Sequence, residues 1–222
     1  MKNLSSFLKA LSFLSLALMF TACNTGTKSD TATTEAAEEA AAPAEEKINI
    51  ANAPIDLAQS LVAWKGEMLG VYAHEGTLKF SEGTVTVSDG EITGGNFVVD
   101  MTSMVPTDEN FNPEEGKTKE KLVGHLSSDD FFAVTDNPTA SFTINEISGN
   151  TAKGTLTVRG KTGEETVENL SVTREGDKVK LTGTLKFNRK NYDVAFDHPV
   201  QEMVISDEVQ LNIELLASSS SS

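Results

Sequence analysis

Apolar and polar residues alternate in short runs along most of the chain after about residue 54, and turn residues separate these runs. Thr84-Val-Thr-Val-Ser88 alternates strictly, and Asp89-Gly90 follows as a hairpin turn signal. Such alternation places every second side chain on one face of a strand. The other strand-like runs are Glu91–Met101, Thr139–Ile147, Thr151–Gly160, Glu165–Thr173, Lys178–Asn188, Asp193–Phe196 and Glu208–Leu216. We therefore expect an all-β domain of about eight antiparallel strands, as a closed barrel or a sandwich.

Two segments depart from this pattern. Gly94-Gly95 interrupts one strand run, and paired glycines there indicate a bulge or sharp bend. Pro113–Val123 contains helix formers without β alternation, and it predicts a short helical insertion. Ser127 or Ser128 could cap a second short turn. In a barrel, an insertion of this kind can lie across one mouth.

Phe131 and Phe132 are adjacent aromatic residues in a polar segment between strand runs. A solvated loop has no reason to carry such a pair, because contiguous exposed apolar surface usually marks a contact. We expect the two rings to plug one mouth of the barrel. His125 is expected either to orient this plug, through a hydrogen bond to the backbone, Asp129 or Asp130, or to contact the headgroup of a ligand.

The N-terminal residues resemble a bacterial lipoprotein signal. Lys2 and Lys9 precede the apolar run Leu11–Phe20, which is short for a membrane span. Phe20-Thr-Ala-Cys23 fits a lipobox, and Cys23 is the single cysteine of the chain, so no intramolecular disulfide is possible. We expect residues 1–22 to be a signal peptide and Cys23 to be lipidated. The alternative is an ordinary signal peptide with a chance cysteine.

Composition divides the rest of the chain. Residues 23–53 begin with a Thr-, Ala- and Glu-rich stretch that lacks aromatics, so we expect a disordered tether, with a short helix as the alternative. Residues 54–217 have the size of one domain, and residues 218–222 form a serine tail that we expect to be disordered.

The chain is strongly acidic. Its net charge is −15, and removing residues 1–22 deletes two lysines and no acidic residue, which leaves −17. This charge argues against nucleic acid as a partner, because phosphates require Lys and Arg. It also argues against electrostatic docking on anionic lipid.

Catalytic signatures are absent from the sequence: there is no Gly-x-Ser-x-Gly elbow, Walker loop or His-Glu-x-x-His motif. His74, His125 and His198 show no metal-ligand spacing. We therefore expect no cofactor, no metal site and no enzymatic activity. The alternative is an enzyme that uses His125 with an acidic partner.

Several segments in order resemble the YceI-like family. The segment from His125 to Phe142 matches the family best. The others are Asp56–Gly66 with its Ser-x-Val-x-Trp pattern, Gly70–Gly76, Gly94–Ser103, Gly154–Thr162, Asn188–Tyr192 and Asp207–Leu211. The resemblance covers residues 54–217 and departs from the family at Gly163–Val167, which is more acidic.

This resemblance implies a lipocalin-like antiparallel barrel that binds a polyisoprenoid, an isoprenoid quinone or a similar long apolar lipid. Expected inward-facing residues are Trp64, Phe80, Phe97, Phe131, Phe132, Phe142, Leu156, Leu185 and Phe187. Expected polar residues at the mouth are His74, His125, Arg189 and Tyr192. For each aromatic, simple filling of the core is the competing role.

The lipobox style and the composition resemble lipoproteins of the Bacteroidetes. We expect a membrane anchor through acylated Cys23, in the envelope of a Gram-negative bacterium and facing the periplasm. A homodimer is possible by analogy with relatives. The alternative function is a ligand-free envelope or stress-related module with a filled barrel that contacts another protein.

Overall fold

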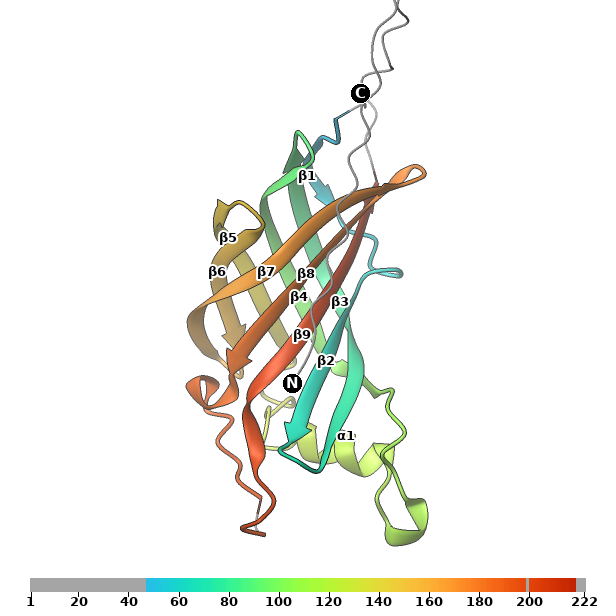
Figure 1. Cartoon of the computed structure of the whole chain (residues 1–222), viewed down its shortest axis with the longest axis vertical. Helices are drawn as coiled ribbons and strands as arrows, with labels where there is room; N and C mark the ends of the chain where they lie inside the picture. The colour runs from blue at the N-terminus through green and yellow to red at the C-terminus, as the bar shows by residue number, and fades with distance from the viewer. Residues whose placement is uncertain (1–46, 199, 219–222) are drawn as a thin grey trace, which may run out of the picture. The chain divides into compact units, whose positions relative to one another are not determined.

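The computed structural model describes residues 47–198 and 200–218, which form nine strands and three short helical segments (Figure 1). The strands are β1 Ile50–Pro54, β2 Leu61–Met68, β3 Tyr72–Ser88, β4 Glu91–Pro106, β5 Thr139–Ser148, β6 Thr151–Val158, β7 Lys161–Glu175, β8 Lys178–Asn188 and β9 Ile205–Ser218. The helical segments are the 3₁₀ turns η1 Pro113–Glu115 and η2 Arg189–Tyr192 and the helix α1 Lys119–Ser127. In these residues, no helix is long and apolar enough to cross a bilayer. The predicted signal peptide and lipidated Cys23 lie outside them.

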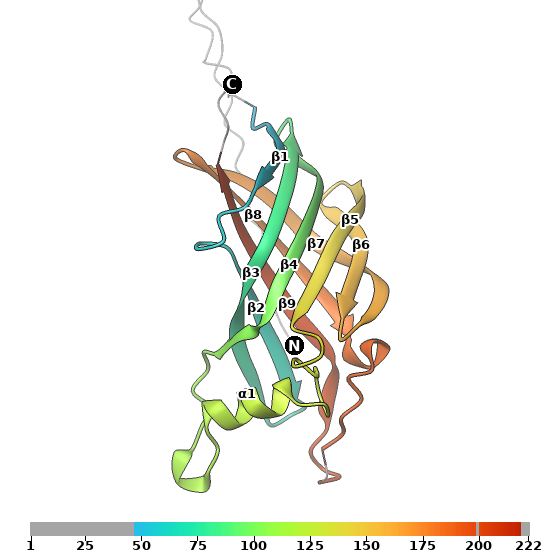
Figure 2. The same ribbon diagram turned by 180° about the vertical axis from the view of Figure 1, so that it is seen from behind.

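The strands form one antiparallel ring. Each strand from β2 to β9 pairs with its neighbour in sequence, and β2 also pairs with β9, which closes the ring. β1 adds to the far part of β3, where Ile50 pairs with Val87. Figures 1 and 2 show the ring from opposite sides. The antiparallel β domain expected from the alternation is confirmed, and of the two architectures left open it is the closed barrel, as the family resemblance implied, and not a sandwich.

Alternation decides which residues face inward. Along β8, Val179, Leu181, Leu185 and Phe187 are buried, whereas the lysines between them are half-buried or exposed. The same period recurs along β6, whose buried positions are every second residue. Burying one such aliphatic or aromatic side chain stabilises the fold by roughly 1.5–3 kcal/mol, so each strand is held in register by its apolar face.

The expected bulge is present. In the β3–β4 ladder, Thr86 pairs with Gly94 but Val87 pairs with Ile92, so one extra residue lies between these pairs. Two further irregularities occur in the same ladder. Bulges increase the twist of a strand pair and allow long strands to curve around a barrel.

The structure corrects three local expectations. Asp193–Phe196 is irregular and not a strand, because Asp193 has a φ of +58° and Arg189 binds the carbonyls of Val194 and Phe196 that a ladder would use. The tether predicted over residues 23–53 includes part of β1, since Ile50 is buried. Ser218, assigned to the disordered tail, is the last residue of β9 and pairs with Lys178.

The helical insertion lies slightly later than expected. α1 begins after Thr118, whose hydroxyl accepts a hydrogen bond from the Lys121 N–H at 3.3 Å. Ser128 closes the helix, because its hydroxyl and its N–H both donate to the His125 carbonyl. Ser128 therefore ends α1, and a short hydrogen-bonded turn follows it, because the Ser128 carbonyl accepts the Phe131 N–H at 3.0 Å.

Gly76 provides a stability prediction because it lies beneath Trp64. A methyl group at Gly76 would lie 2.4 Å from Cζ2 of Trp64 and 2.4 Å from the backbone oxygen of Val105. We expect Gly76→Ala to lower the free energy of unfolding by about 2 kcal/mol, measured by urea denaturation. The matched control is Gly66→Ala, since no described atom outside its immediate neighbours lies within 4 Å of the added methyl. Equal costs for the two variants would contradict this prediction.

Candidate functional site

An apolar cavity of about 550 Å³ occupies the interior of the barrel. Every strand from β2 to β9 contributes lining residues, and α1 adds Leu122, His125 and Leu126 at one end. We call that end the mouth: it contains α1 and the turn between β2 and β3 (Figures 1 and 2). A volume of this size lies within the range of small-molecule sites, and a predominantly apolar lining favours an apolar ligand.

The cavity lies between two groups of packed side chains. Several inward-facing residues touch both groups and are only half-buried: Ala140, Phe142, Ile144, Leu170, Leu211 and Ile213. Their remaining accessible surface faces the hollow, because these same residues line the cavity. The barrel is therefore not filled by its own side chains.

The structure places all nine expected inward-facing residues on the cavity wall. They are Trp64, Phe80, Phe97, Phe131, Phe132, Phe142, Leu156, Leu185 and Phe187. Among the expected polar residues, His74, His125 and Arg189 also line the cavity. Whether any of these residues contacts a ligand stays a prediction.

Tyr192 does not lie on the cavity wall. Its ring is buried edge-on against Phe187, with centroids 5.3 Å apart, and its hydroxyl donates to Oε1 of Glu165 at 2.9 Å. Burial raises the pKa of the Tyr192 hydroxyl well above its usual range, and the neighbouring Glu165 carboxylate raises this pKa further. Tyr192 therefore packs η2 onto β7, and its expected position at the polar mouth is wrong.

Phe131, Phe132 and His125 form the plug at the mouth together with Phe196. The His125 ring meets Phe131 and Phe196 edge-on, at centroid distances of 5.4 and 4.6 Å, and Phe131 meets Phe132 at 5.1 Å. Edge-to-face pairs of this kind are favourable beyond their buried area. The His125 ring makes no hydrogen bond within the described residues, so aromatic packing, and not Asp129 or Asp130, orients it.

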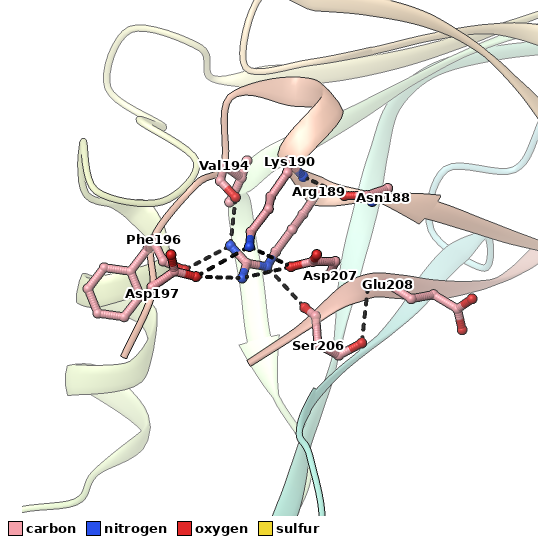
Figure 3. Close-up of polar contacts among 9 residues, drawn as sticks. All are labelled: Asn188, Arg189, Lys190, Val194, Phe196, Asp197, Ser206, Asp207 and Glu208. Atoms are coloured by element: carbon pink, nitrogen blue, oxygen red, sulfur yellow. Dashed lines mark hydrogen bonds and ion pairs between the residues drawn. The ribbon is translucent and has the colours of Figure 1, made fainter. Parts of the chain in front are cut away.

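Arg189 holds the segment between η2 and β9 against the plug (Figure 3). Its side chain is 1% exposed, and its guanidinium donates to the carbonyls of Ser206, Val194 and Phe196 at 3.0, 2.7 and 2.9 Å. Asp207 adds a contact of 3.4 Å, and the guanidinium lies 6.0 Å from the Phe131 ring centroid. A buried charge is tolerated only when it is hydrogen-bonded. These contacts make Arg189 a clamp whose donors are largely committed to the backbone.

His74 lies at the other side of the mouth, in a polar and aromatic cluster. Its Nδ1 donates to the Asp108 carboxylate, 3.2 Å from each oxygen. The His74 ring stacks on Phe111 at 5.1 Å and meets Tyr72 edge-on at 5.0 Å. The carboxylate also accepts the N–H groups of Glu75 and Asn110. Asp108 therefore fastens the loop after β4 to the start of β3.

Asp108 predicts a pH dependence. Burial by itself would raise the pKa of this carboxyl, but hydrogen bonds from Glu75, Asn110 and His74 lower it below the ordinary value of 3.8. A lowered pKa in the fold contributes stability above the ordinary pKa, and this contribution disappears as the pH falls through the folded-state pKa. We expect the stability advantage of the wild type over Asp108→Asn to shrink below about pH 4, in denaturation curves measured at several pH values. A constant difference between the two proteins would contradict this expectation.

The Trp64 indole is an unusual feature of the wall. It is 9% exposed, and its Nε1 is buried without a hydrogen-bond partner among the described residues. An unpaired buried donor is rare and requires an explanation. A bound molecule that carries an acceptor oxygen is one way to satisfy this group.

Several residues that line the cavity were not expected there from the sequence. They include Val62, Leu78, Val85, Leu181, Leu211, Ile213 and Leu215 along the strands and Tyr72, His198 and Ile205 near the mouth. The strand residues follow the alternation, so they could have been found by continuing the inward face along β2, β3, β8 and β9. No local signal marks the three residues near the mouth. Tyr72 and Ile205 both pair with Met68, from different strands, and His198 lies in the irregular segment before β9.

Metal binding finds no support in this site. Although all three histidines line the cavity, no three His, Cys, Asp or Glu side chains in residues 47–198 and 200–218 gather closely enough to hold a metal ion. The polar groups at the mouth are instead paired with the backbone, with a carboxylate or with aromatic rings.

Comparison with known proteins agrees with this architecture. The family model of the YceI-like domain matches residues 54–217 of this chain. The chain belongs to the YceI-like family. This YceI-like protein is also 31% identical over 128 residues to the UPF0312 protein SERP2314 of Staphylococcus epidermidis. The aligned region covers 54% of this chain and 72% of that protein.

Solved structures share the fold of this YceI-like protein. BcnA of Burkholderia cenocepacia is 24% identical, with a TM-score of 0.58 over 74% of this chain and 99% of that chain. A polyisoprenoid binding domain from Saccharophagus degradans is 14% identical, with a TM-score of 0.46 over 78% of this chain and 99% of that domain. The first similarity shows the fold alone, and the second supports no argument about a ligand.

Proposed function

We propose that this YceI-like protein binds a long apolar lipid, such as a polyisoprenoid or an isoprenoid quinone, inside its barrel. The observation that carries the proposal is the hollow, apolar interior of about 550 Å³. Transfer of apolar surface from water into such a site is favourable by about 25 cal/mol per Å² and needs no specific polar contact. A flexible, methyl-branched chain suits a wall of aliphatic and aromatic side chains.

The cavity volume sets a scale for the ligand. At ~30 Å³ for a group the size of a water molecule, 550 Å³ holds about 18 such groups, close to a chain of 20 carbons. A longer chain would extend through the mouth. The unpaired Trp64 N–H favours an amphiphile that carries an oxygen over a pure hydrocarbon.

The anchor and the location are part of the same proposal. Acylation of Cys23 would hold the barrel beside a membrane in the periplasm of a Gram-negative cell, where apolar lipids are found. A role as a binding protein, without catalysis or cofactor, is consistent with mouth residues that serve packing. The alternative function, a ligand-free module that contacts another protein, is less favoured. It requires a barrel filled by its own side chains, whereas this barrel encloses a cavity.

The test is direct isolation of the ligand. The full chain is purified in mild detergent from the membranes of its native cell, and an organic extract is examined by mass spectrometry. We expect an apolar amphiphile in an amount close to that of the protein, and none in an extract from cells that lack the gene. Repeated extracts without such a molecule would overturn the proposal. Affinities for prenyl alcohols of increasing length would then test the volume estimate, with a plateau expected near 20 carbons.

A further inference from the structure

We infer that the mouth carries a surface that inserts into a lipid bilayer. In the part of the chain that the structure describes, seven large apolar side chains are exposed, and five of them lie in two short segments at the mouth. These five are Leu69, Val71, Tyr72, Val200 and Val204, with exposed fractions of 38–58%. We call them the rim patch. Exposed apolar surface gathered in this way usually marks a contact.

The two segments form one surface although they are distant in sequence. Leu69 donates its N–H to the Val204 carbonyl at 2.8 Å, and Met68 pairs with Ile205 in the β2–β9 ladder. The first segment is the turn from β2 to β3, and the second precedes β9. Figures 1 and 2 show both at the end of the barrel that contains α1.

The rim patch continues into the cavity. Met68, Tyr72 and Ile205 line the cavity, whereas their chain neighbours Leu69, Val71 and Val204 face outward. An apolar ligand that moves between a bilayer and the barrel would cross this border without entering water. The inference therefore rests on the proposed function for its occupant, since a lipid surface is the partner that supplies such a ligand.

Charge favours a bilayer over an acidic or basic partner. Residues 68–74 contain no formally charged side chain, and residues 200–206 contain only Glu202. The opposite end of the barrel differs, because the β7–β8 turn includes Glu175, Asp177 and Lys178. Tyr72 suits the boundary between headgroups and acyl chains, where tyrosine is enriched. The loop of residues 107–118, also at the mouth, carries several carboxylates that would remain in water and disfavour anionic lipid.

The length of chain outside the structure permits this orientation. Lys47 pairs with Asp89 at the β3–β4 turn, so the described chain begins at the end opposite the mouth. The 17 residues of β3 span about 55 Å. The 24 residues from Cys23 to Glu46 can reach about 80 Å when extended. A barrel anchored at Cys23 therefore has enough chain to turn its mouth to the same bilayer.

A fluorescent probe on the rim patch tests the inference. The full chain with Cys23→Ser, which prevents acylation, carries Val71→Cys labelled with the environment-sensitive dye NBD. With phosphatidylcholine vesicles we expect a blue shift and quenching by doxyl-labelled lipid. The control is the same dye at Ser88→Cys, an exposed position at the opposite end, which should show neither effect. Replacing part of the lipid with phosphatidylglycerol should not strengthen binding.

A pair of charged variants tests the patch itself. In the unlabelled Cys23→Ser chain, the double substitution Leu69→Asp and Val71→Asp should weaken vesicle binding at least about tenfold. It removes two aliphatic side chains from the surface that the bilayer would bury. The matched control is the double substitution Leu57→Asp and Ser88→Asp, which adds the same charge away from the mouth. It should leave vesicle binding unchanged.

Three results would overturn the inference: no vesicle binding, equal quenching at positions 71 and 88, or self-association through the patch in sedimentation experiments. Ligand retention by the Leu69→Asp, Val71→Asp protein in solution is measured separately. If this variant no longer binds vesicles but retains its ligand, the inference about the rim patch is supported and the proposed function stands. If neither the variant nor the wild type contains a ligand, it is the proposed function that fails.

Discussion

A tryptophan in place of Leu211 is expected to exclude the ligand from the barrel. Leu211 lies in β9, faces Trp64 and Leu185 in the neighbouring strands and lines the cavity with a half-buried side chain. The larger indole would occupy space that a lipid chain needs. With the indole in place, a bound lipid chain would be overpacked, and overpacking of a core costs about 1–3 kcal/mol. We therefore expect the affinity for an apolar ligand to fall at least about tenfold.

The measurement compares two variants of one strand. Leu211→Trp and Asn212→Trp are purified in parallel, and their ligand content is determined by mass spectrometry of organic extracts. Asn212 is exposed and points to the outer face, so its substitution should leave ligand binding unchanged. Denaturation curves establish that both variants fold. If Leu211→Trp does not fold, Ile213→Trp tests the same face two residues later. A folded Leu211→Trp protein with full ligand content would show that the ligand lies elsewhere.

Arg189→Ala is expected to cause the largest loss of stability among single changes at the mouth. The substitution leaves the carbonyls of Ser206, Val194 and Phe196 without their donor and removes the cation above Phe131. Buried groups left unpaired cost roughly 1–3 kcal/mol each, and partial access of water reduces the sum, so we expect a loss of about 3 kcal/mol in the free energy of unfolding. The segment before β9 should also become more accessible to proteases.

The control for Arg189 is its neighbour Lys190. Lys190 pairs with Asp197 and Asp207, and the Arg189 guanidinium also lies near both carboxylates, at 3.8 and 3.4 Å. The Lys190 side chain, however, is 42% exposed. Lys190→Met should therefore cost less than about 1 kcal/mol. Arg189→Lys keeps the charge but cannot reproduce the planar fork of donors, and an intermediate loss is expected. If Arg189→Ala were as stable as Lys190→Met, the clamp would have no role in holding the mouth.

Much of the wall of the site could be read from local pattern. Phe97, Phe142, Leu156 and Phe187 occupy inward positions of alternating strands, and the sequence places them on one face before any fold is known. Phe131 was expected to cover an apolar space because its surroundings are polar, and it does so at the mouth. Such predictions succeed because they depend only on the period of a strand or on the cost of exposing an aromatic ring.

Polar contacts at the mouth could not be read in this way. Tyr192 looked like a mouth residue but packs under Phe187, and Arg189 binds carbonyls 5–17 residues away in the chain. His74 meets Asp108 across 34 residues. These pairs depend on strand register and on loops without periodicity, so tertiary structure alone brings them together.

The sequence by itself determined an antiparallel β domain, the inward face of its strands and a strong net negative charge. Tertiary structure decided that the ring closes through β2 and β9, that its interior is hollow and that one end gathers uncharged apolar side chains. Alternation is a local property, and it assigns each side chain to a face. Cavity volume is the difference between the space inside the ring and the volume of the side chains that point into it. Eight strands and their bulges together set the width of the ring, so no single segment encodes the cavity volume.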